Sequence, residues 1–240
     1  MKFNSTLASF ADGGLAVVIG ESGALGNAFL NRLSAQRRFI HAVGFSRSTT
    51  PALDLTREET IADVARYISG FDEPPRLIID ATGILHDSSA MPEKSWRQLD
   101  PQHLAKAFAV NAIGPALLMK HLLPLLPRLY KSVFATLSAK IGSIGDNQLG
   151  GWYSYRASKA ALNQLVRTAA IELQRQKPEA ICVALHPGTV DSQLSAPFAK
   201  NGVEVRSPLQ AADLLIEVID RLAPADSGGF FDYQGKALPW

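Results

Sequence analysis

Short runs of apolar residues alternate along the chain with longer segments in which apolar residues recur every three or four positions. The short runs are rich in Val, Ile, Leu and Phe, which is typical of buried strands. The longer segments have the period of an amphipathic helix. We therefore predict strands over residues 15–20, 39–45, 76–82, 131–138, 180–188 and 228–233, and helices over residues 24–36, 57–69, 101–126, 151–176 and 207–222.

This alternation continues along the whole chain, without an internal repeat or a linker-like change in composition. Strands joined by helices pair in parallel, because the chain must cross back over the sheet before it enters the next strand. Such crossovers are right-handed, and they place helices on both faces of the sheet. We predict an α/β fold over residues 1–240: a single-domain doubly wound parallel sheet of the Rossmann type.

Composition and charge argue against several classes of function. Apolar residues make up 47% and charged residues 19%, and the formal charge of +2 gives no support for nucleic-acid binding. The single Cys182 cannot form an internal disulfide, and no Cys/His cluster has metal-ligand spacing. No signal-peptide pattern opens the chain, and its longest apolar run is interrupted by Lys120, His121 and two prolines. We expect a cytoplasmic protein without metal, nucleic-acid or membrane partners.

A glycine-rich turn connects the first predicted strand to the first predicted helix, in the sequence VVIGESGALGNAF. Glycines allow a sharp turn, a close approach to a pyrophosphate and tight packing of helix against strand. The N–H groups at the start of the helix can then bind phosphates. A glycine triplet alone would also fit an ordinary turn, but its position favours a dinucleotide site. The expected contacts are Gly20, Ser22, Gly23, Ala24, Leu25 and Gly26.

The end of the second predicted strand indicates which dinucleotide binds. An NAD-binding fold commonly carries an acidic residue here for the ribose 2′-hydroxyl, whereas this chain has Ser46, Arg47 and Ser48. A guanidinium and hydroxyls suit a 2′-phosphate. Two alternatives remain: Arg47 is a solvated loop residue, or Glu21 faces the ribose. We predict NADP as the cofactor, with NAD as the alternative.

Tyr155 and Lys159 lie at positions i and i+4 of a predicted helix, so they share one helix face. A neighbouring ammonium lowers the pKa of a phenol from its usual value of about 10. Tyr155 could then donate a proton to a carbonyl oxygen, or accept one in the reverse direction. The alternative is an ordinary Tyr and Lys on a helix surface.

Several motifs, in order along nearly the whole chain, resemble those of the short-chain dehydrogenase/reductase family. They are GESGALG, LDL with Asp54 and Leu55, DATG over residues 80–83, VNAIGP, YRASK and HPGTVDS. The run SAKIGSIGDNQLGGWYSYRASKAALN and the ending DYQGKALPW resemble the C-factor-like (C-signal-like) subgroup. That subgroup contains small carbonyl reductases and a protein known chiefly for cell–cell signalling.

The resemblance implies roles for further residues. Tyr155 and Lys159 would be the acid/base pair, and Asn111 would bend its helix and hold a water of the proton relay behind Lys159. His186 is expected to be a packed strand-end residue. The resemblance also implies cofactor contacts at Asp54, Leu55, Ala81, Thr82, Gly83, Asn111, Tyr155, Lys159, Pro187, Gly188, Thr189 and Val190.

The serine that polarises the substrate carbonyl is where the chain departs from the family. The family has a Ser-Ser pair after the fourth strand, whereas here Ser138 is followed by Ala139. Ser143 is the competitor, and we favour Ser138 because it ends the strand. Asp80 and Thr82 replace asparagine and alanine beside the cofactor. His86 and Asp87 are expected in a solvated turn, although they could line a pocket.

Two functions remain open at this point. The first is NADPH-dependent reduction of a small carbonyl compound, or the reverse oxidation of an alcohol. The second is a dinucleotide-binding signalling or redox-sensing protein in which catalysis is dispensable. The substrate-specificity segment of the family corresponds to residues 193–208, which are short and mildly apolar and suggest an open site. A homodimer or homotetramer is possible, and a monomer is not excluded.

Overall fold

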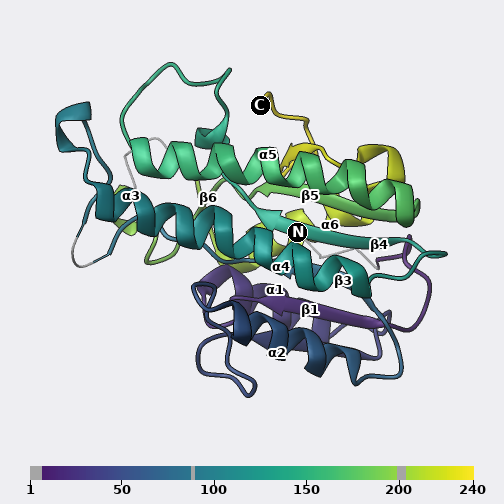
Figure 1. Cartoon of the computed structure of the whole chain (residues 1–240). Coiled ribbons are helices and arrows are strands. Elements are labelled where there is room, and N and C mark those ends of the chain that lie inside the picture. Colours follow the sequence, from purple (N-terminus) through teal and green to yellow (C-terminus); the bar gives the residue numbers. More distant parts are fainter. Residues whose placement is uncertain (1–6, 88–89, 199–203) are drawn as a thin grey trace.

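The computed structural model describes residues 7–87, 90–198 and 204–240. Its main sheet has six parallel strands in the order β2-β1-β3-β4-β5-β8. This confirms the predicted doubly wound α/β fold (Figure 1). The strands are β1 (Leu15–Ile19), β2 (His41–Phe45), β3 (Pro75–Asp80), β4 (Ser132–Leu137), β5 (Ala180–His186) and β8 (Phe230–Asp232).

Helices cover both faces of this sheet, and successive residues of each strand point to opposite faces. Val17 and Ile19 of β1 pack in one core cluster, whereas Ala16 and Val18 pack in the other. The first cluster includes residues from α2 (Glu58–Ser69), α4 (Gly114–Leu122) and α5 (Tyr153–Gln176). The second includes residues from α1 (Ala24–Ser34) and α6 (Pro208–Arg221). Burial on both faces explains why the strands are nearly continuous apolar runs rather than alternating ones.

The strand order reverses between β1 and β3, because the chain adds β2 on one side of β1 and every later strand of the sheet on the other. Loops that leave the carboxyl ends of β1 and β3 therefore diverge to opposite sides. In open parallel sheets the crevice at this reversal is where ligands bind. The fold thus predicts a ligand site at the carboxyl ends of the strands.

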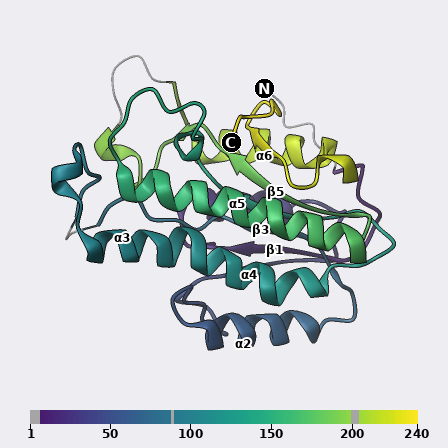
Figure 2. The same cartoon turned by 45° about the horizontal axis from the view of Figure 1, so that its top comes forward.

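The helix predicted over residues 101–126 is interrupted. It consists of α3 (Pro101–Phe108), a π-helical turn (Ala109–Ile113), α4 and a 3₁₀ turn (Leu123–Leu125). Within the described residues, this stretch alone has the length and apolar content of a possible membrane span. Leu118, Met119 and Leu122 of α4 are nevertheless buried in a core cluster of the sheet. The stretch therefore serves as a core helix of the fold (Figure 2).

A second, two-stranded sheet was not predicted. β6 (Thr189–Val190) pairs in parallel with β7 (Val205–Arg206). After β5 and β6 the chain forms a 3₁₀ turn (Ala196–Phe198), and β7 directly precedes α6. Residues 191–198, which follow β6 and which we call the excursion, lie beside the ligand crevice and contribute to its lining. Two-residue strands carry too few alternating positions for a sequence pattern to reveal them.

Candidate active site

A cavity of about 1640 Å³ lies along the carboxyl ends of the strands. Ligand pockets for one small molecule usually measure 300–1,000 Å³, so this cavity has room for a dinucleotide and a second molecule. Of the predicted site residues, Gly26 and Asn111 are outside its lining. The predicted residues that line it are Gly20, Ser22, Gly23, Ala24, Leu25, Ser46, Arg47, Asp54, Leu55, Ala81, Thr82, Gly83, Ser138, Tyr155, Lys159, Pro187, Gly188, Thr189 and Val190.

The glycine turn forms the floor of one half of the cavity. Gly20 has a φ of 84°, in the left-handed region that favours glycine. A Cβ on Gly26 would lie 2.1 Å from the carbonyl oxygen of Gly20, so a side chain here would force the first turn of α1 away from the loop. Gly23 is the N-cap of α1 and offers no side-chain cap. The first N–H groups of α1 are thus free of any side-chain cap, as a phosphate site requires.

The residues at the end of β2 contact Glu21 of the glycine turn. Ser46 is buried, and its hydroxyl donates to Glu21 Oε1 at 2.7 Å. Ser46 Oγ also lies 3.0 Å from Ser48 Oγ. Glu21 thereby faces the serine and is outside the lining of the cavity, whereas the exposed Arg47 lines it. Of Ser46, Arg47 and Ser48, it is therefore Arg47 whose side chain offers a positive charge and hydrogen-bond donors to a phosphate in the cavity.

Asp54 lines the cavity together with Arg47, which lies close enough to act on it through its charge. Hydrogen bonds from the backbone and side chain of Thr56, and then the charge of Arg47, lower the pKa of Asp54. Asp54 is accordingly a carboxylate at neutral pH. The Arg47 guanidinium therefore has a nearby negative charge but remains open to the cavity.

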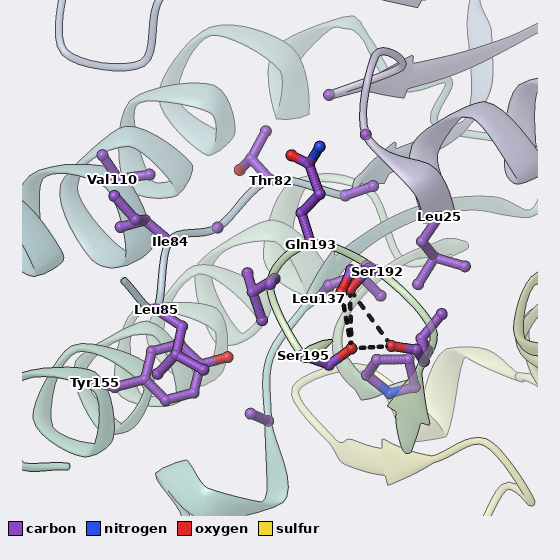
Figure 3. A pocket seen from close by; sticks show the side chains of 18 of the residues that line it. Leu25, Thr82, Ile84, Leu85, Val110, Leu137, Tyr155, Ser192, Gln193 and Ser195 are labelled. Carbon is purple, nitrogen blue, oxygen red and sulfur yellow. Dashed lines mark hydrogen bonds between the residues drawn. The ribbon is translucent and has the colours of Figure 1, made fainter. Parts of the chain in front are cut away.

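Tyr155 and Lys159 lie on the first turns of α5, and both face the cavity. In Figure 3 the phenol oxygen of Tyr155 points toward the middle of the pocket. Lys159 is buried; its ammonium donates to the carbonyl oxygen of Leu137 at 2.8 Å and lies 5.9 Å from the centre of the Tyr155 ring. The predicted pairing on one helix face is thus present, with the ammonium held between the tyrosine and the end of β4.

The expected direction of the Tyr155 pKa was wrong for this arrangement. Burial raises the pKa of the phenol, because phenolate loses its hydration there. Burial also lowers the pKa of Lys159 to about 8, and Asp80 partly opposes this. Tyr155 is therefore a neutral phenol at physiological pH, which suits a proton donor better than a proton acceptor.

Asp80, one of the departures from the family pattern, is a fully buried carboxyl group at the end of β3. It accepts hydrogen bonds from Thr136 Oγ1 at 2.7 Å, and from the N–H at 3.1 Å and hydroxyl at 2.5 Å of Thr82. Burial raises the pKa of Asp80, while these hydrogen bonds and Lys159 oppose the shift. Asp80 thus places an ionisable carboxyl group behind Lys159, where an asparagine would place none.

Asn111 lies in the π-helical turn and is fully buried. Its amide binds the backbone of Ile84 in both directions, donating to the carbonyl oxygen and accepting from the N–H, each at 2.8 Å. It also donates to Ser158 Oγ at 3.1 Å. The expected helix irregularity is thus present. Asn111 fixes the loop after β3 against α5, and its predicted contact with the proton relay stays a prediction.

The two candidate serines have different surroundings. Ser138 lines the cavity directly after β4, and its hydroxyl donates to Asn163 Oδ1 of α5 at 2.6 Å. Ser143 is buried outside the lining of the cavity, and its hydroxyl accepts from the N–H of Asp146 at 3.1 Å. The position of Ser138 at the strand end supports it over Ser143. A rotation of the Asn163 amide, whose Nδ2 has no partner within the described residues, would free the Ser138 proton.

The loop after β5 also lines the cavity. Gly188 has a φ of 75°, and a Cβ on it would lie 3.0 Å from both Arg206 and Tyr233. The Arg206 guanidinium stacks on the Tyr233 ring at 3.8 Å behind this loop. His186, at the end of β5, also lines the cavity, and burial lowers its pKa to about 4. His186 is therefore neutral at physiological pH.

The segment that follows this loop closes on itself. Ser195 donates to the carbonyl oxygen of Val190, and Ser192 Oγ lies 3.2 Å from Ser195 Oγ (Figure 3). Ser192, Gln193, Leu194 and Ser195 line the cavity, and Figure 3 shows Ser192, Gln193 and Ser195 across the pocket from Tyr155. These residues bound part of the cavity, and the expected open site stays a prediction.

Sequence reasoning missed the aromatic lining of this end. Trp152 and Phe198 line the cavity, and so does His86, which was expected in a solvated turn. Asp87 lines the cavity too, so the prediction of a solvated turn was wrong for both residues. No local pattern reveals the contacts of His86, whose Nε2 lies 3.2 Å from the carbonyl oxygens of Gln193 and Leu194. The sequence did offer one signal for Trp152, which follows two glycines and shortly precedes the YRASK motif.

Comparisons with known proteins give a consistent result. The family model described as Enoyl-(Acyl carrier protein) reductase matches residues 34–218. The C-signal of Myxococcus xanthus is 38% identical over 146 residues, which are 59% of this chain and 81% of that protein. The 1-hydroxy-2-glutathionyl-2-methyl-3-butene dehydrogenase of Rhodococcus sp. (strain AD45) is 32% identical over 190 residues, covering 79% of each chain.

Solved structures agree on the fold. The NADPH-bound carbonyl reductase from chicken fatty liver superposes with a TM-score of 0.82 at 22% identity, over 97% of this chain and 96% of that one. Carbonyl reductase Sniffer of D. melanogaster gives a TM-score of 0.81 at 22% identity, over 95% and 99%. With the family match over most of its length, the chain belongs to the short-chain dehydrogenase/reductase family of oxidoreductases.

Proposed function

We propose that this chain is a single-domain oxidoreductase that uses NADPH to reduce a small carbonyl compound, or NADP⁺ to oxidise the alcohol in reverse. The observation that carries the proposal is one cavity lined by the glycine turn, by Arg47 and by Tyr155 with Lys159. Similar proteins support the proposal, since the solved structures with this fold include an NADPH-bound carbonyl reductase and the relatives in sequence include a dehydrogenase.

The chain's own groups fit such a dinucleotide. The turn at Gly20 and Gly26 has no room for side chains, so a pyrophosphate could approach the backbone and the first N–H groups of α1. Arg47 would bind the 2′-phosphate, and the loop at Gly188 would cover the nicotinamide. When bound, NADPH supplies a hydride ion to the carbonyl carbon and is oxidised to NADP⁺.

The protein's residues then control the proton and the orientation of the substrate. Tyr155 donates its phenolic proton to the carbonyl oxygen, so that the C=O group becomes a C–OH group. Its raised pKa keeps that proton in place until the oxygen gains charge. Lys159 places a positive charge beside the resulting phenolate, and Ser138 orients the carbonyl oxygen. The reverse reaction uses the same groups with the proton returning to Tyr155.

A titration of the purified protein with NADPH and separately with NADH tests this assignment, with protein fluorescence as the readout. We expect tighter binding of NADPH, and oxidation of NADPH on addition of small ketones and aldehydes. A folded protein that binds neither cofactor, or that binds NADPH without reducing any carbonyl compound, would contradict the proposal.

The 38% identity with C-signal favours a second candidate function, in which the chain binds a dinucleotide and signals without turnover. The variant Tyr155→Phe separates the two. It keeps the ring and removes the transferable proton, so an enzyme should lose about 10²–10⁴-fold in turnover while its affinity for NADPH is retained. A biological effect that persists in this variant would support the signalling function.

A further inference from the structure

Four aromatic rings form a continuous series from Tyr155 outward along the cavity. Trp152 lies 6.3 Å from Tyr155 between ring centres, Phe198 lies 4.8 Å from Trp152, and His86 lies 5.5 Å from Phe198. All three contacts are edge-to-face, with interplanar angles of 61–67°. We call Trp152, Phe198 and His86 the aromatic wall.

The aromatic wall is assembled from distant parts of the chain. His86 follows β3, Trp152 precedes α5, and Phe198 belongs to the excursion between β6 and β7. Each ring lines the cavity and is partly exposed to it. An edge-to-face contact covers only one face of one of its two rings, and each of these rings is partly exposed, so ring surface remains available to a ligand.

The backbone holds Trp152 in an unusual conformation. Its φ of 52° lies in the left-handed region, which is uncommon for a bulky residue. Its N–H donates to the carbonyl oxygen of Glu93 at 2.5 Å, and its carbonyl accepts from the N–H of Arg156 at 2.8 Å. Backbone conformations of this kind persist where the surroundings fix them, and they cluster at ligand sites.

Charges at this end of the cavity are compensated. Lys106 forms an ion pair with Asp87, and Lys140 lies 3.4 Å from Asp146. Both lysines line the cavity, so an anionic substrate would have to compete with an existing carboxylate partner, and a cationic substrate with an existing lysine. The surroundings therefore favour an uncharged ligand beside the aromatic wall.

We propose that the aromatic wall is a subsite for an uncharged aromatic ring carried by the carbonyl substrate. The proposal rests on the carbonyl reduction proposed above. For proton transfer, the carbonyl oxygen of the substrate must lie within about 3 Å of the Tyr155 hydroxyl. For an aromatic contact, the ring of the substrate must lie about 4.5–7 Å from the centre of the Trp152 ring. Both conditions are met when the chain between the carbonyl group and the ring is short. The ring is attached to the carbonyl carbon directly or through one or two carbons, as in an aryl ketone or an arylacetone.

A matched pair of ketones tests the subsite: 1-phenylpropan-2-one and 1-cyclohexylpropan-2-one, which differ in the aromaticity of the ring. Aromatic pairs contribute about 0.5–1.5 kcal/mol beyond burial, which corresponds to about two- to tenfold. We expect the wild-type protein to prefer the phenyl ketone by that factor in kcat/KM. The variants Phe198→Leu and Trp152→Leu should each abolish the preference.

The variant Trp96→Leu is the control, because Trp96 is exposed and lies outside the cavity lining; it should keep the preference. Phe198→Leu keeps the test valid if Trp152→Leu disturbs the start of α5. Equal kcat/KM values for the two ketones in the wild-type protein overturn the proposal. If Phe198→Leu lowers kcat/KM equally for both ketones, the proposal is also overturned, because the Phe198 ring would then only hold its own segment in place.

Binding separates a failure of this proposal from a failure of the proposed function. If neither ketone is reduced with NADPH or NADH, the proposed function fails. Calorimetric titration of both ketones into the wild-type and Phe198→Leu proteins then decides the subsite alone. Tighter binding of the phenyl ketone that disappears in the variant supports it, and equal binding overturns it.

Discussion

The two halves of the cavity are built in different ways. The cofactor half is formed mainly by backbone: the turn at Gly20, the N–H groups that open α1 and the strand ends at Ala81 and Gly83. The substrate half is formed by side chains that reach it from separate loops, above all Trp152 and Phe198. Backbone that must approach a phosphate constrains the local sequence, whereas a wall of side chains needs only suitable residues that meet in space.

After the loss expected in Tyr155→Phe, the largest effect should come from Ser138, at the boundary of the two halves. Ser138→Ala removes the hydroxyl that orients the carbonyl oxygen, and we expect a loss of about 10²–10³-fold in kcat, the cost of one such donor. Steady-state kinetics with a ketone and NADPH provides the measurement. Ser143→Ala is the matched control, because Ser143 is outside the cavity lining. A greater loss in Ser143→Ala would reverse the assignment.

The difference between the two halves also determines how much of the molecule could be predicted from its sequence. The strands and helices followed from apolar periodicity, and the glycine turn from its place between β1 and α1. β6 and β7 were missed because each has two residues. The aromatic wall was missed because His86 and Phe198 are brought together only by tertiary packing. Local patterns encode what neighbours along the chain must do, and not which distant loops meet.

The next effect tests the cofactor half alone. Arg47→Ala removes the exposed guanidinium beside Asp54, and a lost charge-assisted bidentate contact should raise the KM for NADPH about ten- to a hundredfold. The KM for NADH should stay unchanged, because NADH carries no 2′-phosphate. Arg175→Ala, near the far end of α5, is the control. Equal changes for both cofactors would show that Arg47 does not recognise the phosphate.

A smaller effect should appear where the substrate half is anchored. Glu93 is buried and binds the start of α5, accepting from the hydroxyl of Ser154 and from its N–H at 3.2 Å. Glu93→Ala leaves these donors unpaired, so we expect the free energy of unfolding to fall by about 1–3 kcal/mol. Urea denaturation measures it, with Glu179→Ala as an exposed control. An unchanged midpoint would mean that water replaces the carboxylate at no cost.

The smallest effect concerns the charge of Lys159 at the junction of the halves. The pKa of Lys159 is lowered to about 8 by burial, so its ammonium is lost as the pH rises through that value. If the ammonium supports proton donation by Tyr155, kcat/KM for ketone reduction falls above pH 8. Asp80 raises the pKa of Lys159, so Asp80→Asn should move this descending limb to lower pH while the activity below it changes little. Thr136→Val, which removes one hydrogen bond to Asp80 but leaves its carboxyl group, should move the limb less. A limb that stays in place in Asp80→Asn would show that the buried carboxylate does not set the charge of Lys159, and that the backbone contact with Leu137 does so instead.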